Sequence, residues 1–362
     1  MSASTVDQIP QRDTRLDRAK AIAIALVLFW HLQPVQIVQG SDATLLTRAL
    51  RFGIAQFYLQ ISLVAVPVFL MTSLFLFYQK AAASGLPYLI KRCRRLAELF
   101  VFWSGFQFLA YFAVLALLSA FHEQYSHSIS RIPVWRLVTG GGPPLPVVGD
   151  SVFYFFFVLL VLAPASFGFL IFRRAGRVFT LTGVSAVIFS MVYFEWLGSN
   201  GRVVPYWRMD NFLLYVPLSY FLWRSDPARL RRYVPWLCVG FVLFSVQDIF
   251  LREKGYDSGA YSRVSIVFGS LALISALLQF RASSPRAAIS FLSRYSMGIF
   301  AIHKYWHLLV ISIVREFALP GPANSVVAPF DFRVASVSLI ALCLTFASVY
   351  FGGPTRLGRF LM

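Results

Sequence analysis

The sequence is poor in charged residues, which make up 13% of its 362 residues. Soluble domains carry about 25%. Hydrophobic residues reach 58%, whereas soluble domains have roughly 45–50%. Because each charged side chain costs several kcal/mol in the hydrocarbon of a bilayer, this deficit indicates membrane-spanning helices. It excludes a soluble domain as the main body of the chain.

Acidic residues are especially few: 15 Asp and Glu stand against 33 Lys and Arg, and the net charge is +18. A basic balance is typical of nucleic-acid-binding proteins. Here, however, the basic residues form short clusters between apolar runs, where the positive-inside rule and anionic headgroups favour them. We therefore expect the lipid bilayer as a partner and no nucleic acid.

Cysteine is also scarce, since the chain has only Cys93, Cys238 and Cys343. Their scattered positions exclude a disulfide framework and offer no metal-ligand spacing. The sequence lacks a Gly-rich phosphate loop, a serine nucleophile elbow and a zinc-protease motif. No small-residue cleavage site follows the first apolar run, so we expect this run to be retained as a span rather than removed as a signal peptide.

Long apolar runs fill most of the chain. A membrane-spanning helix needs about 20 mostly apolar residues. The sequence therefore predicts an all-α integral membrane protein with about ten transmembrane helices and both termini cytoplasmic, because most Lys and Arg then fall on the inner side. The predicted spans are 19–38, 54–78, 96–120, 151–172, 178–197, 209–223, 234–250, 264–280, 295–314 and 335–352.

The predicted organisation is a single domain covering 1–362, with tails at 1–18 and 353–362 around a bundle at 19–352. The longest outer segment, about 121–150, is rich in glycine and proline and contains His122 and His127. No internal repeat is visible, which disfavours a transporter built from inverted halves.

Lys20 and His31 stand out in the first span because ionisable residues are expensive in a membrane and mark functional sites. They are eleven residues apart, which brings them within about 20° of one face of a helix and separates them by about 16 Å along its axis. A histidine near the middle of the membrane can exchange a proton if water reaches it. The alternative is a structural histidine that bonds to a neighbouring helix.

Basic residues also open the third span, where Arg92 and Arg95 are three apart and share a helix face. Such a pair can hold phosphates. The alternative is ordinary anchoring to lipid headgroups. Glu98 lies three residues after Arg95 and four after Arg94, so it can pair with either.

The ninth span contains Ser296 and His303, which are seven residues apart and therefore share a face. His307 follows four residues after His303 and can meet the same cavity. Because no carboxylate or third histidine accompanies the two histidines at ligand spacing, we expect no metal site.

Four acidic residues lie near the outer ends of spans. They can line an outward-facing site, or be solvated or paired with loop arginines such as Arg202 and Arg252. They are Glu195, Asp210, Asp248 and Glu316.

The stretches just described resemble the membrane acyltransferase 3 family, whose bacterial members O-acylate surface and secreted polysaccharides. The opening stretch is similar to the family's signature of a basic residue, ten residues and a histidine, which Lys20 and His31 match. Arg92 and Arg95 resemble its Arg-x-x-Arg at the third span. The segment from Ser296 to His303 looks like the family's late Ser–His segment.

The sequence departs from the family at two places. The fourth span of many relatives opens with Trp-Phe-Leu, whereas here the stretch from Ser151 to Phe155 is aromatic without the tryptophan. Beside His31 stands Trp30, where relatives often carry glycine. A tryptophan there would narrow the cavity that admits the acceptor.

The resemblance implies an O-acetyltransferase of a bacterial plasma (inner) membrane that acts in polysaccharide biosynthesis. Its co-substrate would be cytoplasmic acyl-CoA, most commonly acetyl-CoA, with no tightly bound cofactor. Lys20, Arg92 and Arg95 would hold the phosphates of CoA. The acceptor would be a sugar hydroxyl of an exopolysaccharide, another exported glycan or a lipid-linked oligosaccharide, and the polysaccharide assembly machinery would be a further partner.

The resemblance also assigns roles to the polar residues of the first and ninth spans. His31 would act as a general base on the acceptor hydroxyl, or carry the acyl group. His303 and Ser296 would orient it or relay protons. Two other functions stay open, namely a transporter or flippase of a lipid-linked glycan and a non-catalytic partner in polysaccharide assembly.

Overall fold

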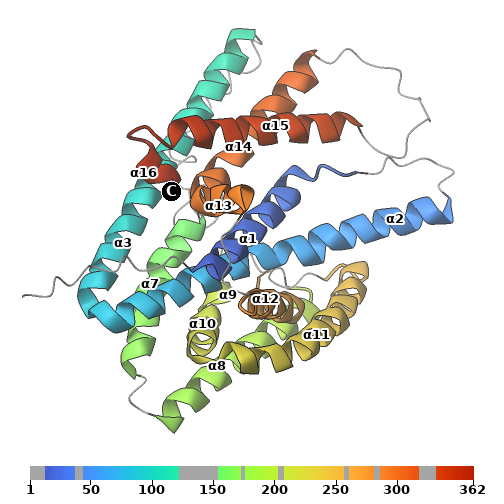
Figure 1. The fold of residues 1–362 in the computed structure, drawn as a ribbon. Coiled ribbons are helices and arrows are strands. Elements are labelled where there is room, and N and C mark those ends of the chain that lie inside the picture. The colour runs from blue at the N-terminus through green and yellow to red at the C-terminus, as the bar shows by residue number, and fades with distance from the viewer. Residues whose placement is uncertain are drawn as a thin grey trace, which may run out of the picture.

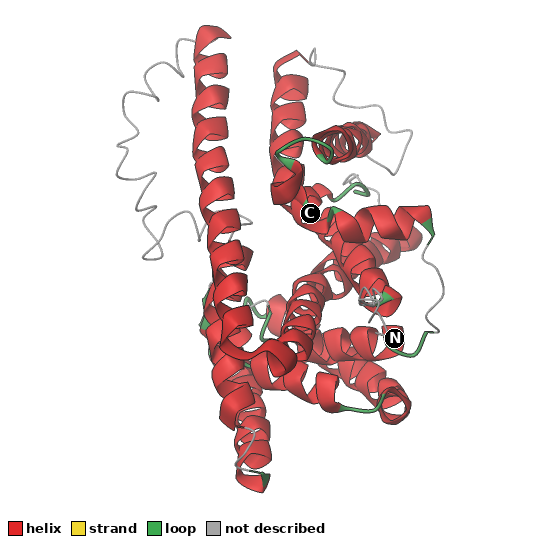
Figure 2. Cartoon of the chain, turned by 60° about the vertical axis from the view of Figure 1, so that its left-hand side comes forward, coloured by secondary structure: helices red, strands yellow, loops and turns green. Residues whose placement is uncertain are grey.

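The computed structural model describes residues 13–36, 44–121, 154–172, 176–202, 208–256, 261–280, 286–317 and 332–362. Within these ranges every regular element is a helix and none is a strand (Figure 2). The prediction of an all-α protein is therefore confirmed. The helices are α1 (Thr14–Leu32), α2 (Leu45–Gln56), the π-helix η1 (Phe57–Ile61), the 3₁₀-helix η2 (Ser62–Val64), α3 (Ala65–Phe121), α7 (Tyr154–Phe172), α8 (Arg177–Ser199), α9 (Asp210–Leu213), α10 (Tyr215–Arg224), α11 (Pro227–Glu253), α12 (Val264–Leu277), α13 (Ala287–Arg294), α14 (Ser296–Phe317), α15 (Phe332–Gly352) and α16 (Gly358–Leu361).

Several helices suit a membrane by length and composition. In the described part of the chain, five stretches are long and apolar enough to cross one: Leu45–Phe106, Tyr154–Phe172, Val178–Ser199, Pro227–Glu253 and Arg333–Gly352. All ten predicted ranges overlap helices, whereas the number of crossings and the side of each terminus stay predictions. His122 and His127 lie outside the described residues.

The segment predicted as a loop between the second and third spans is helical instead. α3 runs through it and bends at Gly85, whose φ of 64° is a conformation that glycine adopts without steric cost (Figure 1). Pro87 follows the bend at the start of the second half, where its missing N–H leaves no helical hydrogen bond unmade. The segment also carries Lys80, Lys91 and Arg92, and this basic clustering favours a segment between two spans.

α1 begins at Thr14 rather than at 19, because Asp13 caps it and accepts a 3.0 Å hydrogen bond from the Arg15 N–H. Burial raises the pKa of the Asp13 carboxyl, but hydrogen bonds from the side chain and backbone of Arg15 outweigh it and leave this pKa below its usual value. Arg15, Asp17 and Arg18 therefore belong to the helix.

The last residues also pack against the bundle. Phe360 of α16 stacks on Phe102 of α3 with ring centroids 3.8 Å apart. The Trp103 indole N–H donates a 3.3 Å hydrogen bond to the Phe360 carbonyl. The segment predicted as a tail thus contains α16, which packs against α3.

α1 occupies a central position, where it contacts α3, α12, α13 and α14 (Figure 1). Its buried residues include Ala19, Ala23 and Ile24, which are almost fully inaccessible. Small residues let neighbouring helices approach closely in a membrane bundle. Any polar side chain on α1 is therefore placed among several helices at once.

Candidate functional site

Two hydrogen bonds fix how α1 meets the last helices. The Ser293 hydroxyl at the end of α13 donates a 2.6 Å bond to Asp17 in the first turn of α1. At the other end of α1, the Ser338 hydroxyl of α15 donates a 2.8 Å bond to the carbonyl of Leu32. Because all these groups are buried, the bonds form away from competing water and hold α1 in register with α13 and α15.

The same register brings His31 and His303 together. The centroids of the two imidazole rings lie 5.0 Å apart, with the rings tilted by 51°. His303 on α14 has 0% exposed surface, while His31, in the last turn of α1, is only partly buried. The pair therefore has one partly buried member and one member with no exposed surface.

The orientation of His303 is set by its own helix. Its Nδ1 lies 3.0 Å from the Ile299 carbonyl oxygen. A carbonyl can only accept, so Nδ1 carries the proton in this contact and Nε2 of the neutral ring keeps a lone pair. Among the described residues, Nε2 has no hydrogen-bond partner. Burial of a hydrogen-bond acceptor without a partner costs free energy. Nε2 can therefore accept a proton or bind a ligand.

This arrangement can perform acid–base chemistry. A partly exposed imidazole can take a proton from a hydroxyl that approaches within hydrogen-bond reach. A second imidazole behind it, held in one tautomer by a backbone carbonyl, can fix the orientation of the first, as the third group does in catalytic triads. The His31–His303 pair supplies both imidazoles, with ring centroids 5.0 Å apart.

Ser296 does not join this pair. It lies at the start of α14, where its hydroxyl donates a 3.0 Å hydrogen bond to the Ser293 carbonyl. Although Ser296 and His303 share a helix face, seven residues separate them by about 10 Å along the axis. The contacts of Ser296 therefore support the junction of α13 and α14 rather than the histidines.

Arg92 and Arg95 lie in the second half of α3. The Arg92 guanidinium donates a 2.8 Å bond to the Ser73 hydroxyl in the first half. Arg95 lies 3.8 Å from Glu98, and its guanidinium is 5.9 Å from the centre of the Phe360 ring. Contacts with Ser73, Glu98 and Phe360 hold both side chains in place, and both keep further N–H donors.

Lys20 is partly buried on α1. It follows Asp17 by one turn, and its eleven-residue separation from His31 corresponds to about 16 Å along a continuous helix. α1 is continuous from Thr14 to Leu32, so the spacing expected from the sequence holds. Lys20 therefore lies toward the Ser293 end of α1, away from the histidine pair.

One polar network was not expected. Asp248, which the sequence predicts to line an outward-facing site, to be solvated or to pair with a loop arginine, is buried and lies 3.7 Å from the buried Arg263. Ser265 donates a hydrogen bond to the same carboxylate. Arg263 also donates a 3.2 Å bond to the Leu59 carbonyl of η1. The network ties α11 and α12 to the π-helix.

Two further acidic residues have partners that the sequence did not suggest. Asp210 accepts a 2.8 Å bond from Arg208, and this carboxylate raises the pKa of the Arg208 guanidinium. Glu195 accepts a 2.7 Å bond from Gln247. The side chain of Glu316 is not among those described.

The sequence alone did not indicate a role for Asp17 or Arg263. Asp17 lies just before the predicted span 19–38, and an acidic residue in the first turn of a helix is a signal for a helix N-terminus. Arg263 lies between the predicted spans 234–250 and 264–280. Among the described residues, no three His, Cys, Asp or Glu side chains gather where they could hold a metal ion.

Comparison with known protein families gives one result. The family model described as an acyltransferase domain matches residues 13–352 of the chain. No curated protein and no solved structure matches. The matched range runs from the cap of α1 to the end of α15 and includes both histidines.

Proposed function

We propose, from the premise that the chain belongs to the membrane acyltransferase 3 family, that it moves an acetyl group from acetyl-CoA to a sugar hydroxyl. The acceptor is a surface or exported polysaccharide, or its lipid-linked precursor, and the protein works in a bacterial plasma membrane. The observation that carries this proposal is the contact between His31 and His303, with ring centroids 5.0 Å apart.

The step at His31 is an acyl transfer. The acceptor hydroxyl gives its proton to His31 as its oxygen attacks the thioester carbonyl. A new C–O ester bond forms and the C–S bond to CoA breaks. The proton on His31 then passes to the departing thiolate, so the products are an O-acetyl sugar and free CoA.

His303 supports this step as a positioning residue. Its Nδ1–H is held by the Ile299 carbonyl, so its Nε2 keeps a lone pair on a ring whose centroid lies 5.0 Å from that of His31. An acceptor placed there favours one ring orientation of His31 and stabilises the imidazolium that forms during transfer. Ser296 contributes indirectly by supporting the start of α14.

The donor binds through its phosphates. Arg92 and Arg95 each retain N–H donors beyond their contacts with Ser73 and Glu98, and Lys20 adds a third cation from α1. Guanidinium groups bind phosphate oxygens in a bidentate manner. The long arm of CoA then carries the thioester along the bundle from Lys20 toward His31.

The proposal is tested with membranes that contain wild type or His31→Ala at matched abundance, together with the native glycan. Acetyl-CoA labelled on its acetyl group is supplied, and label is followed into the glycan fraction. We expect label with the wild type and none with His31→Ala. Label with both variants would remove His31 from the chemistry. No label with either would indicate another donor, a glycan transporter or a non-catalytic assembly partner.

A further inference from the structure

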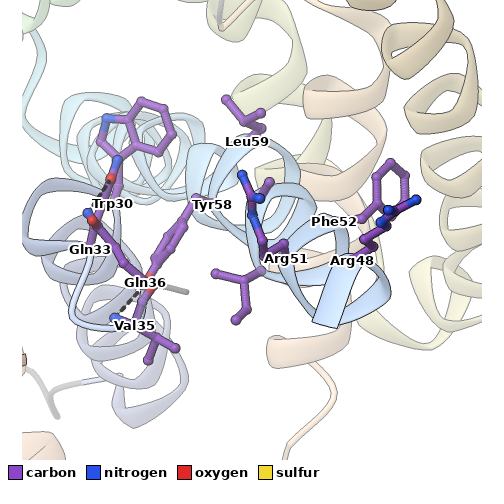
Figure 3. A pocket seen from close by; sticks show the side chains of 11 residues that line it. Trp30, Gln33, Val35, Gln36, Arg48, Arg51, Phe52, Tyr58 and Leu59 are labelled. Carbon is purple, nitrogen blue, oxygen red and sulfur yellow. Dashed lines mark hydrogen bonds between the residues drawn. The ribbon is translucent and has the colours of Figure 1, made fainter. Parts of the chain in front are cut away.

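A groove of about 590 Å³ opens where α1 ends, between α1 and α2 (Figure 3). On one side it is lined by Trp30, Gln33 and Gln36, and on the other by Arg48 and Arg51. Trp30 and Gln33 bracket His31 in sequence, so the groove spans the level of α1 at which His31 lies. Trp30, which lines the groove, is the neighbour of His31 in the chain, and His31 itself is not among the lining residues.

The floor of the groove is held rigidly. The Tyr58 hydroxyl accepts a 3.0 Å hydrogen bond from the Val35 N–H and donates a 3.1 Å bond to the Val35 carbonyl. The next residue of the floor, Leu59, has its carbonyl bonded to the buried Arg263. These bonds fix η1 against the end of α1. A π-helix of this kind is frequent at functional sites.

The lining combines groups that bind glycans and anions. An aromatic face and side-chain amides suit sugar rings and their hydroxyls. Arg48 and Arg51 add two guanidinium groups, and in the described part of the chain neither forms an ion pair. α2 itself contains no acidic residue. The groove therefore carries two positive charges that no nearby carboxylate of α2 neutralises.

The two opposite faces of α2 differ in chemistry, one being basic and the other apolar. Arg48, Arg51 and Ala55 follow one another at helical spacing on the groove side. The opposite side carries Leu46 and Leu50, which are 68% and 45% exposed. In a membrane protein such an exposed apolar face lies among acyl chains, with the basic face at headgroup level. Figure 1 shows α2 running outward from the bundle, as this placement requires.

We propose that this groove binds the acceptor through the phosphate group that joins a glycan to a membrane lipid. Arg48 and Arg51 contact the phosphate oxygens, the exposed leucine face of α2 lies beside the lipid chain, and Trp30 and Gln33 hold the sugar beside His31. The role of this site rests on the proposed acyl transfer, but binding of a lipid phosphate to the groove can be measured without an acyl donor.

The test measures binding of tritiated farnesyl phosphate to the full chain in phosphatidylcholine nanodiscs, without acyl-CoA. Farnesol, which lacks the phosphate, is measured in parallel. Wild type should bind farnesyl phosphate more tightly than farnesol. R48Q/R51Q should weaken farnesyl phosphate binding at least roughly tenfold and leave farnesol binding unchanged, because only charge-assisted bonds to phosphate are lost. Rising salt should weaken the wild-type complex selectively.

A matched control removes the same charge elsewhere. Arg229 and Arg231 are exposed on α11, and R229Q/R231Q should bind farnesyl phosphate as the wild type does. Equal weakening in both double variants, or equal affinity of wild type for farnesyl phosphate and farnesol, would overturn the proposal. Equal competition by soluble glucuronate would overturn the assignment to a lipid phosphate.

Failure of the proposed acyl transfer is distinguishable from failure of this site. Absent transfer from acetyl-CoA, with farnesyl phosphate binding that still depends on Arg48 and Arg51, would reject the transferase and support the groove. R48Q/R51Q should have the same unfolding temperature as the wild type, because both side chains project from an exposed helix. This control verifies that the variant is folded.

Discussion

Ser293 donates a buried 2.6 Å hydrogen bond to Asp17, and this bond joins the end of α13 to the first turn of α1. α14 begins two residues after α13 ends, so the bond also sets the position of His303 relative to His31. The candidate site thus depends on a contact far from the histidines themselves.

Replacement of Ser293 by Ala should destabilise the protein by about 1–3 kcal/mol, because it removes a donor from a buried carboxylate. It should also lower acyl transfer through a shift of α14 against α1. The unfolding temperature in detergent measures the first effect, and the transfer assay with acetyl-CoA labelled on its acetyl group measures the second. Ser290→Ala, one turn earlier on the same helix, is the matched control and should change neither. Equal effects of both variants would contradict a specific role of the Ser293–Asp17 bond.

Two substitutions of His303 separate its two ring nitrogens. In His303→Asn the amide nitrogen takes the place of Nδ1 and can still donate to Ile299, but the Nε2 acceptor is lost. In His303→Gln the amide lies nearer the position of Nε2. We expect Gln to retain more kcat than Asn, at unchanged KM for acetyl-CoA. The measurement is initial rate against donor concentration, with the pH profile of each variant.

The opposite order, with Asn equal to wild type, would show that only the bond to Ile299 matters. His303 would then serve the fold of α14 and not the orientation of His31. Abundance and unfolding temperature of both variants control for simple misfolding, since each amide preserves one polar group in the buried position.

Replacement of Arg95 by Gln should raise KM for acetyl-CoA roughly tenfold, as expected for the loss of a charge-assisted bond to phosphate. kcat should stay near the wild-type value because the phosphates lie far from the reacting carbonyl. Arg94→Gln is the control: Arg94 is 82% exposed in its side chain and pairs with the same Glu98 at 3.1 Å. If both variants raise KM equally, general surface charge rather than Arg95 binds the donor.

Replacement of Gly240 by Ala should separate α11 from α12. A Cβ at Gly240 would lie 2.3 Å from the Phe268 ring, and overpacking of this kind costs about 1–3 kcal/mol. Gly105→Ala is the control, because a Cβ there meets nothing within 4 Å. The unfolding temperature should fall for Gly240→Ala and stay the same or rise for Gly105→Ala. An unchanged unfolding temperature for Gly240→Ala would mean that Phe268 moves aside without cost.

The sequence by itself determined the class of protein. Apolar runs of about 20 residues predict membrane helices because unpaired backbone groups cannot enter hydrocarbon. It also placed Lys20 and His31 on one face of α1, since the spacing within one helix follows from its geometry. The family followed from three local motifs, and the match to residues 13–352 confirms it.

The tertiary structure decided which of these residues meet. Contacts between helices depend on register and on polar bonds between distant segments, such as Ser293 to Asp17. A membrane helix that is apolar on nearly all sides has no stripe from which its packed face can be read. For that reason the His31–His303 contact, the distance of Ser296 from it and the burial of Asp248 against Arg263 could not be deduced from the order of residues alone.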